Sequence, residues 1–140
     1  MNGPVLLDTG PLVAYLDRRD GYHEWVLTQF HQIRPPQLTC ESVLSESLFL
    51  LARVPDADRG IMELLTRGVL AVPFRLDEEL VAVFGLLARY REVPMSLADA
   101  CLVRMAELHS SGVVLTTDSD FRVYRKNRRQ IIPTIMPDDL

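Results

Sequence analysis

The sequence predicts a single α/β domain, residues 1–140, with a small central parallel sheet flanked by several helices. Compact apolar runs at residues 5–7, 69–72 and 113–116 have the length and composition of buried strands. They alternate with longer segments whose apolar residues recur every three or four positions, as on one face of a helix. Strands that alternate with helices are typical of a parallel sheet covered by helices.

The composition is that of a globular protein, with 48% apolar and 24% charged residues, and it excludes a disordered chain. No apolar run approaches the roughly 20 residues that span a bilayer. The N-terminus also lacks the basic segment and cleavage site of a signal peptide. We therefore expect a cytoplasmic protein with no membrane contact. Cys40 and Cys101 have no CxxC spacing and are expected to be buried free thiols.

The first half of the chain is expected to contain four helices after the strand at 5–7. They lie at residues 11–16, 22–33, 40–53 and 55–67, with a short extended segment at 37–39. Pro35-Pro36 ends the second helix, and Thr39 is a favoured N-cap residue for the third. Gly68 closes the fourth helix, because glycine is common just after a helix end. The apolar face of the third helix is expected to include Val43, Leu44, Leu48 and Leu51.

The second half is expected to contain two longer helices. The first covers residues 76–91 and begins with acids, which the helix dipole favours there. Its apolar side should include Leu80, Val83, Phe84 and Leu87. Ser96 caps the second helix, over residues 97–109. After the strand at 113–116 we expect a short helix or turn through Phe121 and Tyr124, and an edge strand at 131–133.

Asp8 and Asp118 each follow a predicted strand. Right-handed crossovers place the C-terminal ends of parallel strands along one edge of a sheet, and ligands bind at that edge in open α/β sheets. We therefore expect the two carboxylates to lie close together, although they come from opposite ends of the chain. The alternative for each is a plain helix N-cap, a common role for Asp.

Glu46 and Asp99 lie on predicted helices. Glu46 is at the flank of an apolar stripe, three residues after Val43, and a solvated surface position is the alternative. Asp99 is the fourth residue of Ser96-Leu97-Ala98-Asp99, which resembles a capping box. It also shares a helix face with Leu102, so its side chain should point at protein, where a carboxylate needs a partner.

The four acids together suit a site for divalent metal. Two-metal phosphoryl transfer needs several carboxylates around ions roughly 3.5–4 Å apart, because hard cations prefer oxygen ligands. A set of Asp and Glu without Cys or His favours Mg²⁺ or Mn²⁺ over zinc. We therefore expect one or two such ions.

Four segments around these acids resemble the acidic motifs of PIN-domain ribonucleases, in particular the VapC-type toxins of toxin–antitoxin pairs. In chain order they read VLLDTGPLVAYLD, ESVLSESLFLL, MSLADACLVRMA and VVLTTDSDF, and the resemblance extends over nearly the whole chain. The resemblance places the family's catalytic metal acids at Asp8, Glu46, Asp99 and Asp118. It implies that Thr116 orients the carboxylate of the last acid, with Thr9 and Asp120 as further supporting residues.

The same resemblance implies an activity and partners. The activity is Mg²⁺- or Mn²⁺-dependent endonucleolytic cleavage of RNA. The partners are a second copy of the chain, in a homodimer, and a small antitoxin whose tail inserts into the acidic site.

Basic residues near the motifs are candidates for contacts with RNA phosphates. Arg122, Arg125 and Lys126 follow the last motif, and Arg53 lies two helical turns after Glu46. The alternative for the basic run is a solvated face. The net charge of −4 does not exclude an RNA substrate, because the distribution of charge matters more than its sum.

Two other functions fit parts of the sequence. A catalytically silent PIN-like module could keep the four acids to bind a basic segment of a partner protein. A phosphatase or receiver-like domain could use Asp8 as a phosphoacceptor. The second reading is weakened because no DxD follows the first strand and no lysine follows a late strand where one is expected.

Overall fold

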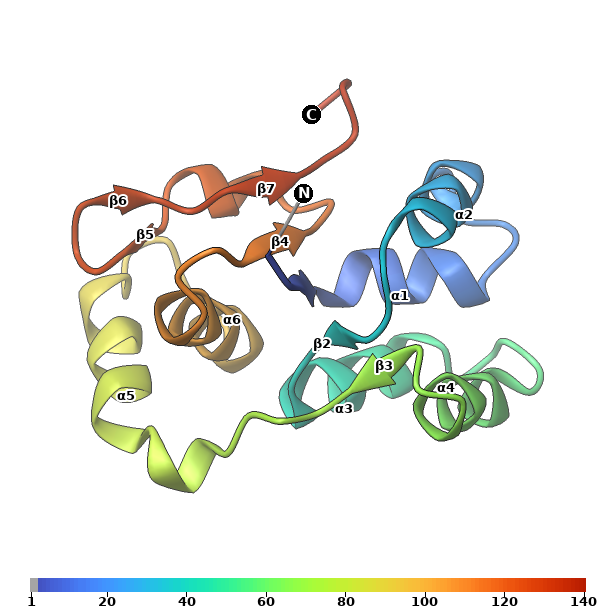
Figure 1. Cartoon of the computed structure of the whole chain (residues 1–140), viewed down its shortest axis with the longest axis horizontal. Helices are drawn as coiled ribbons and strands as arrows, with labels where there is room; N and C mark the ends of the chain where they lie inside the picture. The colour runs from blue at the N-terminus through green and yellow to red at the C-terminus, as the bar shows by residue number, and fades with distance from the viewer. Residues whose placement is uncertain (1–2) are drawn as a thin grey trace.

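Five parallel strands form the main sheet of the structure, a computed structural model that describes residues 3–140. Their order is β3-β2-β1-β4-β7 (Figure 1). They are β1 (Val5–Leu7), β2 (Gln37–Leu38), β3 (Leu70–Ala71), β4 (Val113–Leu115) and β7 (Thr134–Ile135). The predicted α/β fold with a small parallel sheet is confirmed.

Successive strands are added first on one side of β1 and then on the other. The chain moves outward from β1 through β2 to β3, then crosses back to β4 on the other side of β1. Leu7 of β1 pairs with Leu115 of β4, so the residues that follow these strands are neighbours. Such a switch point is where open α/β sheets form their binding crevices.

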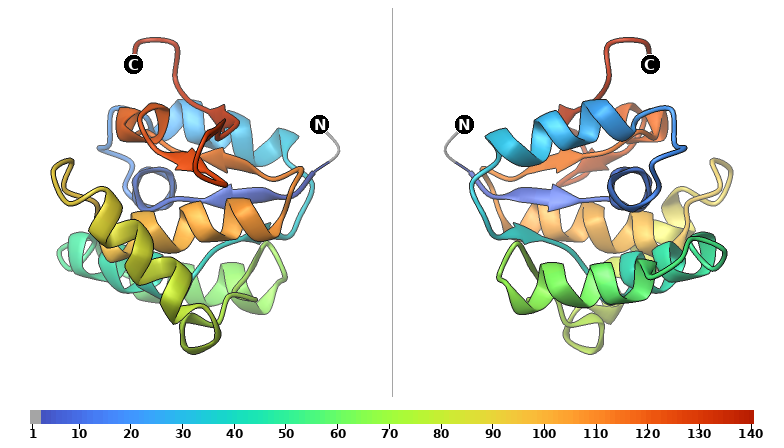
Figure 2. Two further views of the ribbon diagram at one scale, coloured as in Figure 1. Left: turned by 90° about the vertical axis from the view of Figure 1, so that its left-hand side faces the viewer. Right: turned by 90° about the vertical axis from the view of Figure 1, so that its right-hand side faces the viewer.

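Helices cover both faces of the sheet. They are α1 (Thr9–Leu16), α2 (His23–Gln32), α3 (Glu41–Leu50), α4 (Ala57–Thr66), α5 (Leu80–Arg89) and α6 (Leu97–Leu108). Figure 2 shows α2 on one side of the strands and α6 on the other. Burial from both faces explains the continuous apolar runs of β1 and β4, since Leu6, Leu7, Val114 and Leu115 are fully buried.

The helix expected at 40–53 is shorter in the structure and is capped differently. It ends at Leu50, and a turn follows. Leu48, expected on its buried face, is 42% exposed, whereas Val43 and Leu51 are buried. Thr39 is not the N-cap residue, because its hydroxyl donates to the Leu7 carbonyl at 2.8 Å and so joins β2 to β1.

The helix expected at 76–91 is two elements, the 3-10 helix η1 (Leu76–Glu78) and α5. The expected buried side was also partly wrong. Val83 and Leu86 are buried, but Leu80 and Phe84 are about half exposed. α5 packs against α6, and the side of α5 that carries Val83 and Leu86 is buried, which leaves Leu80 and Phe84 partly exposed.

The C-terminal segment differs most from the prediction. After the 3-10 helix η2 (Ser119–Arg122), β5 (Arg125–Lys126) and β6 (Gln130–Ile131) form an antiparallel hairpin. An edge strand was expected at 131–133. The edge strand of the main sheet is instead β7, at Thr134–Ile135, which pairs with β4. Asn127 and Arg128 have positive φ in the hairpin loop. A run of basic residues does not indicate such a backbone conformation.

Other expectations about the core hold within the described residues. Cys40 and Cys101 are free and buried. Tyr15 and Phe30 stack with ring centroids 4.4 Å apart, which joins α1 to α2. None of the helices in residues 3–140 is both long and apolar enough to span a membrane.

Candidate metal centre

Asp8 directly follows β1 and is the N-cap residue of α1. Its backbone N–H donates to the Leu115 carbonyl at 3.0 Å, which extends the pairing of β1 with β4. Its Oδ1 accepts a hydrogen bond from the Thr9 N–H, and its Oδ2 accepts one from the Thr116 hydroxyl, both at 2.7 Å. The carboxylate is thus held in one orientation, and only 4% of the residue is exposed.

Thr116 connects Asp8 with Asp118. Its hydroxyl donates to Asp8 Oδ2 and accepts from the Asp118 backbone N–H at 2.9 Å. The hydroxyl thus contacts the carboxylate of Asp8 and the backbone of Asp118, because β4 pairs with β1 and brings Thr116 next to Asp8. The Asp118 carboxylate accepts instead from the Asp120 N–H at 2.9 Å and caps η2.

Asp99 lies in the first turn of α6. Its backbone N–H donates to Ser96 Oγ at 3.0 Å, the contact that the capping pattern predicted. Oδ2 of its carboxylate accepts a hydrogen bond from the Tyr124 hydroxyl at 2.9 Å, and contacts with Ser96 also lower the pKa of this carboxyl group. Capping by Ser96 and a place for the Asp99 carboxylate in a site are therefore compatible.

One pocket brings the four acids together. Asp8, Asp99 and Asp118 line it with Glu46, which is exposed on α3. Thr9 and Gly10 at the start of α1 also line it, but Asp120 is not among the lining residues of the described chain.

Three residues of the pocket had no sequence signal. Asp20 and Tyr22 come from the turn between α1 and α2, and Leu50 comes from the end of α3. The turn reaches the pocket only because α1 and α2 pack together. Asp20 adds a fifth carboxylate at the border of the pocket.

Gly10 allows α1 to approach the segment after β4. A Cβ atom built at Gly10 would lie 2.1 Å from Thr117 Oγ1, so any larger residue requires the Thr117 side chain to move. The glycine of the Thr-Gly-Pro turn therefore brings the N-terminal end of α1 against the segment that carries Asp118.

Within the described part of the chain, the negative charges of the pocket are not balanced by basic side chains in its lining. Burial raises the pKa of Asp8 to about 7, against the hydrogen bonds from Thr116 and Thr9. The nearby charges of Asp99 and Asp118 add to this rise. Burial also raises the pKa of Asp99, and the hydrogen bond from Tyr124 opposes that rise. Among residues 3–140, no Lys, Arg or His lines the pocket.

The donor chemistry of the pocket fits a hard divalent cation. All its charged groups are carboxylates, and a cation would favour the ionised form of Asp8, whose pKa is raised mainly by burial and further by the charges of Asp99 and Asp118. As the side chains lie, no group of three or more His, Cys, Asp or Glu in residues 3–140 converges on a single ion position. Binding therefore requires less constrained side chains of the pocket, such as the exposed Glu46, to turn toward the ion.

Comparisons with known proteins identify the family and the fold. Residues 5–127 match the family described as the PIN domain. The chain belongs to the PIN domain family. The crystal structure of VapC20 from Mycobacterium tuberculosis has the same fold, with a TM-score of 0.75 at 21% identity over 85% of this chain and 93% of that chain. The curated proteins searched contain no match.

The basic residues of this PIN domain that were expected to contact RNA phosphates differ in their exposure. Lys126 is buried, and its ammonium group donates to the Ser110 carbonyl at 3.0 Å. Arg125 donates to the carbonyls of Arg122, Val123 and Tyr124. Both side chains are thus bonded to backbone carbonyls of the chain itself, and their contact with RNA phosphates stays a prediction. Arg53 and Arg122 are exposed.

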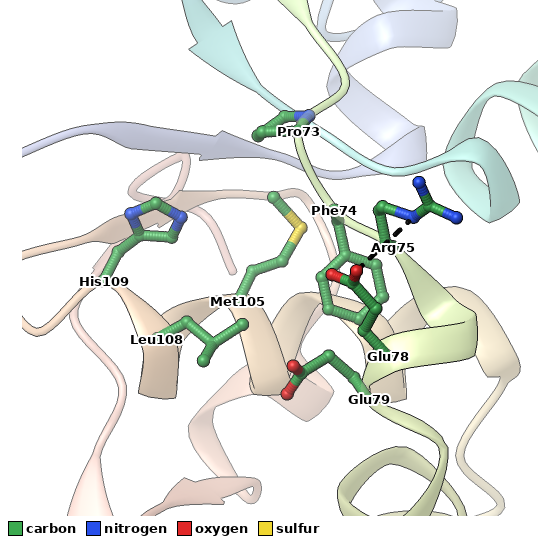
Figure 3. A pocket seen from close by; sticks show the side chains of 8 residues that line it. All are labelled: Pro73, Phe74, Arg75, Glu78, Glu79, Met105, Leu108 and His109. Carbon is green, nitrogen blue, oxygen red and sulfur yellow. Dashed lines mark ion pairs between the residues drawn. The ribbon is translucent and has the colours of Figure 1, made fainter.

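A second pocket of the PIN domain differs in charge (Figure 3). It is lined by Pro73, Phe74, Arg75, Glu78, Glu79, Met105, Leu108 and His109. Its acids have basic partners, since Arg75 lies 3.9 Å from Glu78 and Arg104 donates to Glu79 at 2.6 Å. These carboxylates are already paired, so the pocket between β1, α3 and α6 is the better candidate for a cation.

Proposed function

We propose that this PIN domain is a metal-dependent endoribonuclease and the toxin of a toxin–antitoxin pair. One observation carries the proposal: Asp8, Glu46, Asp99 and Asp118 line one pocket that, within residues 3–140, has no basic side chain in its lining. Mg²⁺ or Mn²⁺ is the class of ion that such an oxygen-only donor set favours.

The residues of the chain hold and orient the proposed site. When bound, one or two divalent ions supply the Lewis acidity that phosphodiester hydrolysis needs. Asp8 would be a ligand of fixed orientation, because both of its oxygens are hydrogen-bonded. Asp99 and Asp118 would be further ligands, each held through one oxygen. Glu46, being exposed, would turn into the pocket when the ion and RNA bind.

The proposed substrate is RNA, contacted through exposed arginines such as Arg53 and Arg122. VapC20 is described as a toxin that cleaves the sarcin–ricin loop, so a hairpin of that loop is a suitable first substrate for this chain. The 21% identity supports a shared fold and leaves the sequence preference to be measured.

The proposed protein partners are an antitoxin and a second copy of the chain. Phe49 is 80% exposed on α3, and its neighbour Leu50 lines the acidic pocket. An antitoxin tail with apolar and basic side chains would match this border. Val81 of α5 is 92% exposed beside Phe84, which supports a homodimer through α5. We place the protein in the cytoplasm with these partners.

Cleavage of an RNA panel tests the nuclease proposal. Wild type, Asp99→Asn and the control Glu78→Gln are freed of co-purified partners and incubated with structured RNAs in Mg²⁺ or Mn²⁺. Glu78 is an acid outside the proposed site. We expect wild type and Glu78→Gln to cleave, EDTA to stop them, and Asp99→Asn to be at least about 100-fold slower. A folded Asp99→Asn protein that cleaves at the wild-type rate would contradict the proposal.

The catalytically silent module is the second candidate. It is favoured by the absence, within residues 3–140, of three acids that already converge on one ion position. It predicts that calorimetry detects no binding of Mn²⁺ to wild type, together with tight binding of a basic, apolar peptide.

A further inference from the structure

Tyr124 is a buried residue whose hydroxyl reaches the acidic pocket. It lies between η2 and β5, is fully buried, and donates to Asp99 Oδ2 at 2.9 Å. No motif pointed to it, because 25 residues separate it from Asp99. A buried tyrosine hydroxyl usually finds one partner, and this partner is a proposed metal ligand.

The ring of Tyr124 is fixed by two aromatic neighbours. Tyr90 and Phe121 both meet it edge to face, with centroids 5.2 and 5.3 Å away. The hydroxyl of Tyr90 accepts from the Arg125 N–H at 2.9 Å and so ties the cluster to β5. Since its ring is held by packing, the Tyr124 hydroxyl has a fixed position, and it fixes in turn the oxygen to which it donates.

We propose that Tyr124 is a positioning residue of the metal site, which holds Asp99 through Oδ2 and leaves Oδ1 to face the ion. The inference rests on the proposed function insofar as it takes Asp99 to be a metal ligand. Hydrogen-bond partners of this kind behind metal ligands typically change metal affinity by about 10- to 100-fold.

Tyr90 provides a matched control for Tyr124. Both Tyr90→Phe and Tyr124→Phe remove one hydroxyl from the same aromatic cluster and keep the ring. The hydroxyl of Tyr90, however, binds a backbone N–H of β5 rather than a site carboxylate. A purely structural role of the cluster predicts similar effects of the two variants on the metal site.

Calorimetric titration with Mn²⁺ tests the proposal. We expect Tyr124→Phe to weaken Mn²⁺ binding by about tenfold and Tyr90→Phe by less than about twofold, with circular dichroism showing both variants folded. Replacing Tyr124 with p-aminophenylalanine, which keeps the ring and a donor, should restore most of the affinity. If Tyr124→Phe folds poorly, the p-aminophenylalanine variant still tests whether a donor at this position is needed for Mn²⁺ binding.

A double-mutant cycle shows whether Tyr124 acts through Asp99. In the Asp99→Asn background, Tyr124→Phe should cause no further loss of Mn²⁺ affinity. Equal losses in both backgrounds, an unchanged affinity in Tyr124→Phe, or no Mn²⁺ binding by wild type would overturn the proposal. If wild type binds Mn²⁺ but cleaves no RNA, the nuclease proposal fails while the affinities still decide the role of Tyr124.

Discussion

Thr116 and Asp8 are 108 residues apart in the chain and are joined by a hydrogen bond of 2.7 Å, from the Thr116 hydroxyl to Asp8 Oδ2. The same hydroxyl accepts from the Asp118 N–H. One threonine therefore ties the acids that follow β1 and β4 into a single unit at the switch point of the sheet. Most of the predictions below follow from this unit and its charge.

Removal of the Thr116 hydroxyl should destabilise the protein. Thr116→Val keeps the shape but leaves Asp8 Oδ2 and the Asp118 N–H without this buried partner, at a cost of about 1–3 kcal/mol in the free energy of unfolding. Urea unfolding measures the change. Thr116→Ser, which keeps the hydroxyl and removes only the methyl group, is the control, and a Thr116→Val protein that is as stable as wild type would contradict the prediction.

The raised pKa of Asp8 should make stability fall as the pH rises. In the folded state this pKa is about 7, against 3.8 for the ordinary group, so between these values the folded protein holds a proton that the unfolded chain has lost. The contribution of this proton to the free energy of unfolding is present in full below about pH 4. It decreases by at most roughly 4 kcal/mol between pH 4 and pH 7. Asp8→Asn, which is always neutral, should lack this dependence.

Unfolding by urea in EDTA at pH 4.5, 6 and 8 checks the role of Asp8. The stability of Asp8→Asn relative to wild type should increase with pH. A difference that stays constant across this range would show that Asp8 is ionised in the folded protein throughout.

The contact between Gly10 and Thr117 should appear as a coupling between the two positions. Gly10→Ala alone forces the Thr117 side chain to move, because the new Cβ would lie 2.1 Å from Thr117 Oγ1. In a Thr117→Ala background the same change should stabilise α1 by up to about 1 kcal/mol, since alanine is the better helix former. Thermal unfolding of the four proteins gives the coupling, and strictly additive effects would contradict the contact.

Lys126 and Arg122 should affect RNA binding differently. Lys126→Met removes a buried hydrogen bond to the Ser110 carbonyl and should lower stability by about 1–3 kcal/mol, with no change in the salt dependence of RNA affinity. Arg122→Ala should leave stability unchanged and reduce the slope of log affinity against log salt by about 1 if Arg122 contacts a phosphate. Fluorescence anisotropy with labelled RNA, in an Asp99→Asn background that prevents cleavage, measures the slope. A lower slope in Lys126→Met would show that its ammonium group reaches RNA.

The amino-acid sequence by itself was enough to predict the fold class and the four acids that line one pocket of the structure. Asp8 and Asp118 follow apolar runs whose composition only a buried parallel strand explains, and the crossover rule then places them at one edge. The capping contact of Ser96 with Asp99 depends on a local pattern of four residues, so it could also be predicted from the sequence. These features depend on neighbours in the chain or on general rules of topology.

Tertiary structure alone decided which groups support the acids. Thr116 binds Asp8 rather than the Asp118 carboxylate because β4 pairs with β1, and Tyr124 meets Asp99 because η2 and β5 pack against α6. Lys126 is buried because a hairpin with two residues of positive φ turns it toward Ser110. Hydrogen bonds between residues so far apart in the chain depend on the packing of whole elements, and a pattern of residue types along the chain does not encode that packing.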